Sequence, residues 1–116
     1  MKNRISTSLS SIKTNNEIVQ VLNKSKKMNL PYISLWIGKQ SNKSLIQYAL
    51  LVNKTQFKTA VTRNKIKRQL RNILITSELG GGLKILFKPN ATYLKWNYQQ
   101  IKEQLINVIS KYQNGK

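Results

Sequence analysis

The sequence predicts an α+β fold, a single domain in which one mixed β-sheet is packed by helices. Apolar residues recur at helical spacing in three segments, and short β-rich segments lie between these helices. The chain has 116 residues and shows neither an internal repeat nor a second domain. The segments follow the order α-β-β-β-α-β-α, and a sheet covered by helices buries all of their apolar faces.

The first half of the chain is expected to hold one helix and two or three strands. Residues 1–13 are basic and Ser-rich, which predicts a flexible N-terminal tail before a domain over 14–116. A helix should begin at Thr14 or Asn15 and end near Asn23–Ser25. Its apolar stripe would contain Ile18, Val21 and Leu22.

Two strands should follow this helix, after a segment, Lys26–Leu30, that is either a short strand or a connection. In the strand Pro31–Ile37, side chains alternate between the two faces of a sheet. Gly38–Ser44 has the composition of a hairpin loop that leads into a returning strand, Leu45–Asn53. The two predicted faces of the first strand are Ile33, Leu35 and Ile37 on one side and Tyr32, Ser34 and Trp36 on the other.

The second half is expected to contain a helix over Lys58–Thr76, a strand over Leu83–Phe87 and a last amphipathic helix over Tyr93–Tyr112. The glycine run at 80–82 must end the first of these helices, because each glycine would cost about 1 kcal/mol inside it. Such a run can also cradle phosphate, although a turn is the simpler interpretation. The aromatic residues expected to pack the last helix are Tyr93, Trp96 and Tyr98.

The charge of the chain points to a polyanionic partner. Lys and Arg number 21 against 3 acidic residues, which gives a net charge of +18. Nucleic acid is the usual partner of so basic a protein, because binding releases the counterions condensed on it. A membrane surface is the rival polyanion, but no segment approaches the roughly 20 apolar residues of a membrane span. The N-terminus also lacks the apolar core of a signal peptide.

The residues that are absent argue against a catalyst that works alone. The sequence has no His, no Cys and no Asp, and its three acidic residues are far apart in the chain. General acid–base catalysis and divalent metal sites need such groups close together. We therefore predict no catalytic residue, no metal ligand, no bound cofactor and no small-molecule substrate for the protein itself. The lack of Cys is compatible with a cytoplasmic location.

The helix after residue 58 carries the most informative pattern. On a helical wheel its cations and one amide fall in a continuous arc about 140° wide, beside the arc of its apolar residues. Guanidinium groups can grip phosphate with paired hydrogen bonds, and an amide can bond a ribose hydroxyl or a base edge. The alternative is a solvated charged face, but no acidic residues at i+4 balance these cations. The arc consists of Arg63, Asn64, Lys67, Arg68 and Arg71.

The segment from Ala60 to Arg71, A-V-x-R-N-K-x-K-R-x-x-R with Ile66 between Lys65 and Lys67, resembles the RNR helix motif of the bacterial ribonuclease P protein family. Val52-Asn53-Lys54 resembles the family's approach to that helix. Outside this motif, the order and spacing of the predicted helices and strands are also similar to those of the family, although less specifically, over roughly residues 12–112. The resemblance implies a left-handed β-α-β crossover and a role beside a catalytic RNA that removes the 5′ leader of precursor tRNA.

The resemblance also implies roles for particular residues. Mg²⁺ would be held by the RNA subunit and not by the protein. The partners would be ribonuclease P RNA and the 5′ leader. Side chains expected to bind RNA are Lys54, Lys58, Arg63, Asn64, Lys65, Lys67, Arg68 and Arg71. Those expected to line a leader cleft are Ile18, Leu22, Ser34, Trp36 and Lys67.

The sequence departs from the family pattern at four of these places. Lys65 replaces the second arginine of the motif. This change keeps the positive charge and loses the paired N–H donors of a guanidinium group. Thr55 stands where a second lysine is usual, and Ile18 and Leu22 replace aromatic residues of the first helix. These aliphatic side chains cannot stack on bases, which implies a weaker leader contact or one that rests on Trp36. Trp36 could equally be a core residue.

Other classes of protein remain open on composition alone. A ribosomal or other structural RNA-binding protein without a processing role has the same charge, and only the Arg63–Arg71 motif argues against it. A membrane-surface protein is disfavoured by the strand content and the ordered cations. A DNA-binding protein is disfavoured because no helix-turn-helix spacing is present.

Overall fold

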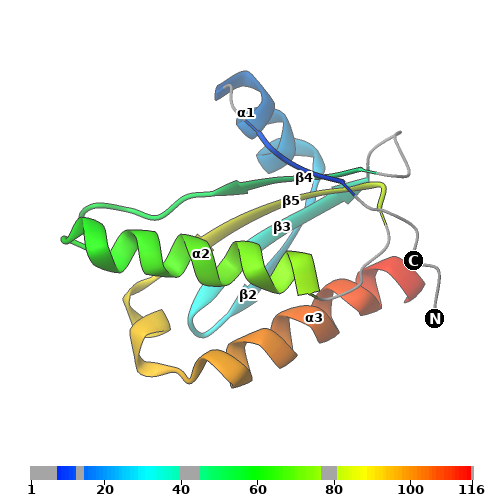
Figure 1. The fold of residues 1–116 in the computed structure, drawn as a ribbon. Helices are drawn as coiled ribbons and strands as arrows, with labels where there is room; N and C mark the ends of the chain where they lie inside the picture. Colours follow the sequence, from blue (N-terminus) through cyan, green and yellow to red (C-terminus); the bar gives the residue numbers. More distant parts are fainter. Residues whose placement is uncertain (1–7, 13–14, 40–44, 77–80, 116) are drawn as a thin grey trace.

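The computed structural model describes residues 8–12, 15–39, 45–76 and 81–115. In these residues five strands form one mixed sheet in the order β1-β4-β5-β3-β2, with α2 and α3 on one face and α1 on the other (Figure 1). The elements are β1 (Ser8–Ser11), α1 (Asn15–Lys24), β2 (Lys26–Leu30), β3 (Ile33–Lys39), β4 (Leu45–Leu50), α2 (Ala60–Thr76), β5 (Leu83–Pro89), the 3₁₀ helix η1 (Ala91–Lys95) and α3 (Tyr98–Gly115).

The order of the strands corrects one prediction. We expected β3 and β4 to pair as a hairpin, but β5 lies between them, antiparallel to β3 and parallel to β4. β4 carries apolar residues on both of its faces, since Ile46 and Ala49 are each buried in a different cluster. A strand buried on both faces is suited to the parallel part of a sheet, which β4 enters through the α2 crossover.

The crossover from β4 through α2 to β5 has the predicted left hand. Both strands run from right to left in Figure 1, with β4 above β5 and α2 on the viewer's side of the sheet. This sense is the opposite of the usual right-handed connection between parallel strands.

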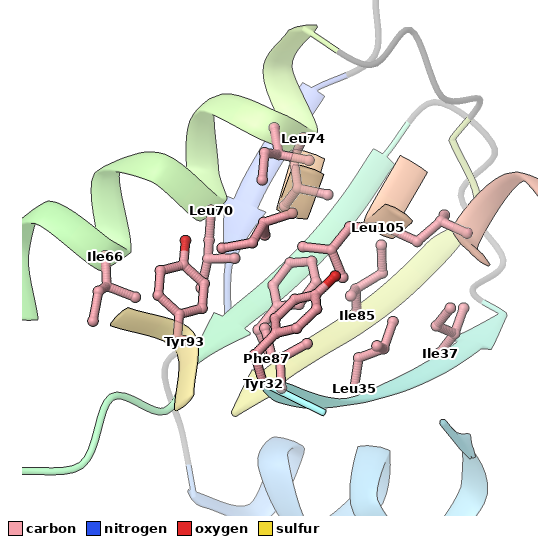
Figure 2. Close-up of a cluster of buried hydrophobic side chains, with 14 of the residues drawn as sticks. Tyr32, Leu35, Ile37, Ile66, Leu70, Leu74, Ile85, Phe87, Tyr93 and Leu105 are labelled. Atoms are coloured by element: carbon pink, nitrogen blue, oxygen red, sulfur yellow. The ribbon is translucent and has the colours of Figure 1, made fainter. Parts of the chain in front are cut away.

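The larger hydrophobic cluster lies between the sheet and the two long helices. Figure 2 shows side chains of α2, α3 and η1 meeting those of β3 and β5. Burial of this apolar area is the main favourable contribution to folding. The fully buried members include Ile33, Leu35, Ile37, Ile66, Leu70, Ile85, Phe87 and Leu105.

The smaller cluster lies on the opposite face of the sheet, under α1. Its buried members are Ile12, Val21, Ala49 and Leu86. Ile12 is only 8% exposed, and β1 pairs in parallel with β4. The prediction of a flexible tail over 1–13 is therefore wrong for residues 8–12, whose backbone completes the edge of the sheet. Residues 1–7 and 13 lie outside the described part of the chain.

Tyr32 corrects a second prediction. It was expected to face the same side as Ser34 and Trp36, but it lies in the turn before β3 and is fully buried in the larger cluster. The alternation of a strand does not extend into a turn. The ring of Trp96 lies 4.7 Å from that of Tyr32, centre to centre, and Tyr93 is 3% exposed. The packing role predicted for the aromatic residues before and within α3 is confirmed.

Three tyrosine hydroxyls connect the helices on this face. Tyr32 Oη donates to Gln104 Oε1 at 2.8 Å, and Tyr93 Oη donates to Gln69 Oε1 at 3.0 Å. Asn72 Nδ2 donates to Tyr98 Oη at 3.1 Å. Burial raises the pKa of Tyr32 to about 12 and raises that of Tyr93 above its usual range. These bonds hold α2 and α3 in fixed rotation about their own axes.

Replacing Tyr32 by Phe should remove part of the protein's sensitivity to alkaline pH. The folded pKa of Tyr32 is about 12 against 10.0 in the unfolded chain. Its contribution to stability is therefore fully present below pH 10 and is lost as the pH rises towards 12. Urea unfolding should show Tyr32→Phe to be less stable by about 1 kcal/mol at pH 8. The difference should narrow above pH 10. If the difference in unfolding free energy between the two proteins stayed constant as the pH rose above 10, the raised pKa of Tyr32 would be contradicted.

Candidate nucleic-acid interface

The loop between β4 and α2 is held by its own side chains. Asn53 Oδ1 accepts a hydrogen bond from the N–H of Thr55 at 2.6 Å, and the carbonyl of Asn53 accepts one from the N–H of Phe57 at 2.9 Å. Phe57 is 1% exposed and belongs to the larger cluster. The buried ring anchors the loop, so Lys54 and Lys58 are exposed on an ordered segment.

The start of α2 is capped by Thr59. Its hydroxyl oxygen accepts a hydrogen bond from the N–H of Thr62 at 3.2 Å. Arg63, one turn into the helix, turns back towards the loop. Its Nη1 donates to the carbonyl of Phe57 at 2.9 Å and to that of Lys58 at 3.1 Å, and the residue is half-buried. The first arginine of the motif is thus engaged with the protein's own backbone.

The remaining cations of α2 lie along its outer surface. Gln69 and Asn72 bond Tyr93 and Tyr98, so one flank of α2 faces η1 and α3. The other flank carries the predicted arc, which the structure brings together. Asn64, Arg68 and Arg71 are exposed there, and Lys67 is half-buried.

Two other exposed residues of this helix lie outside the predicted arc. Lys65 is exposed but one turn before Gln69, so it belongs to the flank that faces η1 and not to the arc. Val61, with 80% of its surface exposed, is an apolar residue on the outer side of the helix. The α2 surface, defined as Lys54, Lys58, Asn64, Lys67, Arg68 and Arg71, is therefore a row of donors along the loop and the helix.

A second basic surface, which the sequence interpretation largely missed, lies on the sheet face under α1. Trp36 is half-buried there, and the ammonium of Lys27 lies 5.2 Å from the centre of its ring. Lys27 opposes Trp36 on β2, and Leu86 opposes it on β5. Lys84 and Lys88, two positions to either side of Leu86, share this face. In Leu83–Pro89, side chains alternate between the two faces of the sheet. This alternation would place Lys84 and Lys88 beside Trp36 once β5 is known to pair with β3.

A short polar row continues this surface. Ser34 pairs with Asn29 on one side and with Lys88 on the other. The Ser34 hydroxyl donates to Asn29 Oδ1 at 2.8 Å. The sheet surface, defined as Lys27, Asn29, Ser34, Trp36, Lys84 and Lys88, thus combines one aromatic ring with three cations, the composition that single-stranded nucleic acid favours.

The structure brings together only part of the predicted leader cleft. Ile18 and Trp36 both pack against the smaller cluster, and Leu22, on the same helix as Ile18, is an exposed apolar residue. Lys67 does not join them. It lies on α2, which packs on the face of Ile33 and Leu35, whereas Trp36 points to the other face. The grouping of Lys67 with Trp36 is therefore wrong, because adjacent residues of β3 face opposite sides.

Ser25, which links α1 to β2, lies close to Gly38 of β3. A Cβ added to Gly38 would lie 2.5 Å from the Ser25 hydroxyl oxygen. Glycine at this position lets the end of α1 approach the sheet.

The glycines after α2 form a turn. Gly82 has a φ of 84°, a conformation that glycine adopts without steric cost. Its N–H donates to the carbonyl of Leu45 at 2.8 Å and is therefore not directed at a ligand. Gly80 lies outside the described residues.

Two other kinds of site were sought among the described residues, metal centres and membrane spans. Within them, no group of three or more His, Cys, Asp or Glu side chains comes together. None of the helices in this part of the chain has both the length and the apolar character to cross a membrane.

Together, the left-handed crossover, the mixed sheet and the basic helix beside it define an α+β RNA-binding protein of the ribonuclease P type. Comparison with known proteins agrees with this class. The family model "Ribonuclease P" matches residues 7–113, and the chain belongs to the ribonuclease P protein family. It is thus a component of an endoribonuclease, with ribonuclease P RNA as its partner, and not a structural RNA-binding protein of another class.

Individual relatives support the assignment. Over 82 residues the chain is 39% identical to the ribonuclease P protein component of a Pseudanabaena species, covering 69% of this chain and 71% of that protein. The Staphylococcus aureus ribonuclease P protein has a similar structure, with a TM-score of 0.75 at 20% identity, over 86% of this chain and 92% of that one. The Thermotoga maritima protein gives 0.73 at 18% identity, over 85% and 94%.

Replacing Gly38 by Ala should destabilise the protein through its contact with Ser25. The added methyl group would displace the Ser25 side chain, at an expected cost of about 1 kcal/mol in the free energy of unfolding. The double variant Gly38→Ala with Ser25→Ala should recover most of this loss, because the nearest atom is then absent. Thermal unfolding followed by circular dichroism measures both. Equal stability of the single and double variants would show that the contact is unimportant.

Proposed function

We propose that this protein binds ribonuclease P RNA through the α2 surface and the 5′ leader of precursor tRNA through the sheet surface. In this way it would assist removal of the leader to give the mature 5′ end. The observation that carries the proposal is the presence of two different basic surfaces on opposite faces of one sheet. One is a rigid row of cations, and the other surrounds an aromatic ring.

The α2 surface suits a folded RNA with closely spaced phosphates. α2 contains no acidic residue, so its cations are not neutralised along the helix. Arg68 and Arg71 are exposed on neighbouring turns, and guanidinium groups can each hold a phosphate with two hydrogen bonds. Asn64, exposed beside them, can bond a ribose hydroxyl, which distinguishes RNA from DNA.

The sheet surface suits a single strand. Bases stack on exposed aromatic rings with little dependence on sequence, and lysines follow the phosphates. Lys27 already covers part of the Trp36 ring, so an incoming base would compete with it or use the remaining ring surface. Ile18, which packs against the same cluster as Trp36, would fill the place of an aromatic residue without stacking on a base.

Catalysis would reside in the RNA subunit. We assign no catalytic residue and no metal ligand to the protein, and Mg²⁺ would be held by the RNA to activate the attacking water. The protein's own contribution would be to neutralise phosphates that repel one another and to hold the leader beside the cleavage site. The proposal places the protein in the cytoplasm, where both RNA partners are made.

Removing two cations from the α2 surface should weaken binding to the RNA subunit. The variant Arg68→Ala with Arg71→Ala should lower the affinity for ribonuclease P RNA by about tenfold or more at physiological salt. It should also reduce the slope of log K against log salt by about 1–2. The matched control is Lys111→Ala, an exposed cation on α3. An equal loss in the control would indicate diffuse attraction and not a defined surface.

The same variants test the function. Single-turnover cleavage of 5′-labelled precursor tRNA should be slow with the RNA subunit alone and faster with the wild-type protein at near-physiological Mg²⁺. The double variant should lose that gain at protein concentrations that saturate the wild type. A wild-type protein that binds the RNA tightly and adds nothing to cleavage would contradict the proposed function.

Replacing Trp36 should affect the leader alone. Trp36→Leu keeps an apolar side chain over the smaller cluster and removes the ring, whose stacking on a base is worth about 1–3 kcal/mol. The holoenzyme should bind precursor tRNA about tenfold more weakly, and mature tRNA as before. Trp96→Phe, on the other face, is the control and should change neither affinity. If Trp36→Leu weakened the binding of precursor tRNA and mature tRNA equally, the leader would not be the ligand of the sheet surface.

A further inference from the structure

The structure assigns Arg63 a positioning role: we infer that it acts on RNA through the β4–α2 loop, by holding Lys54 and Lys58 in place, and not by gripping phosphate itself. This inference rests on the proposed function, in which these lysines bind ribonuclease P RNA. It departs from the expectation that the first arginine of the motif is an RNA contact like the others.

The hydrogen bonds of Arg63 carry the inference. Nη1 has two hydrogens, and the carbonyls of Phe57 and Lys58 accept from it at 2.9 and 3.1 Å. Arg63 is half-buried, whereas Arg68 and Arg71 on the same helix are exposed. Because both hydrogens of Nη1 are used inside the protein, the pair formed by Nη1 and Nη2 cannot grip a phosphate from outside, and only Nε and Nη2 keep free donors.

The two carbonyls lie just before the N-terminus of α2 and take no part in its hydrogen-bond ladder. If the helix extended one turn further back, the N–H of Thr62 would reach the carbonyl of Lys58. That N–H instead bonds the Thr59 hydroxyl oxygen, which ends the helix there. Arg63 thus donates to two carbonyls outside the helix, at the point where the chain leaves the loop.

Between Asn53 and Lys58 two other features hold the loop. The Asn53 turn holds its first half, and the buried ring of Phe57 holds its middle. Lys58 follows Phe57 directly and is exposed, so the Arg63 bonds fix the backbone from which its side chain leaves. Without them, Lys58 would have to be ordered at the moment of binding, and that lost freedom would reduce affinity.

A double-mutant cycle separates positioning from direct contact. The variant Arg63→Met keeps the apolar stem and removes the donors, and it is combined with Lys54→Ala plus Lys58→Ala. The affinity of the full-length protein for ribonuclease P RNA is measured in both backgrounds. If Arg63 acts through the lysines, Arg63→Met should cost about tenfold in the wild-type background and less than about twofold without the lysines. An equal factor in both backgrounds would overturn the inference.

The matched control is Arg68→Met, an exposed cation of the same helix. It should cost the same factor in both backgrounds, because it does not touch the loop. If Arg63→Met unfolds below the assay temperature, Arg63→Lys replaces it under the same criterion, since lysine keeps the charge and loses the fork. If the wild-type protein failed to bind the RNA, the proposed function would be refuted. If the wild-type protein bound tightly but Arg63→Met cost the same factor in affinity in both backgrounds, only the inference about Arg63 would fail.

Hydrogen exchange of the protein without RNA gives an independent readout. Amides of residues 54–59 should exchange faster in Arg63→Lys than in the wild type, and those of α2 after Arg68 should be unchanged. Unchanged exchange in the loop would also overturn the inference.

Discussion

The burial of Ile66, Leu70 and Leu74 against the sheet determines where each polar side chain of α2 can lie. These residues fix the rotation of the helix about its axis, and the hydrogen bonds of Gln69 and Asn72 to two tyrosines prevent it from rolling. The cations of α2 other than Lys65 then lie on the opposite flank. A helix with the same charges and a looser core would present a diffuse positive field, whereas this one presents donors at fixed spacings.

The cost of this arrangement is electrostatic. A net charge of +18 on 116 residues opposes compaction, and like charges one turn apart on α2 destabilise the helix. The protein meets this cost with apolar packing on both faces of the sheet. β5 shows this most clearly, because Ile85, Leu86 and Phe87 are all buried although they point alternately to opposite sides. RNA would then remove the repulsion, so folding and binding favour each other.

Much of the fold follows from patterns within the sequence, and the errors have a common origin. The helical spacing of α2 and the spacing of Ile33, Leu35 and Ile37 are local features, and both were predicted. The pairing of β3 with β5 joins segments about fifty residues apart, and no local pattern reports it. The hairpin prediction failed for that reason. For the same reason no local pattern shows that Lys84 and Lys88 are neighbours of Trp36. Ser8–Ile12 contains too few apolar residues for the sequence to predict a strand there.

The candidate site illustrates the difference between residue type and residue role. The sequence placed Asn64, Lys67, Arg68 and Arg71 on one flank of α2, because charge and helical period are sufficient for that. It could not separate Arg63 from Arg68, because the difference lies in the carbonyls that the loop presents to one and not to the other. A motif records only which residue types occur at which spacing. An arginine that positions a loop therefore looks the same in the motif as an arginine that contacts RNA. The two roles separate only when the backbone acceptors around each guanidinium are known.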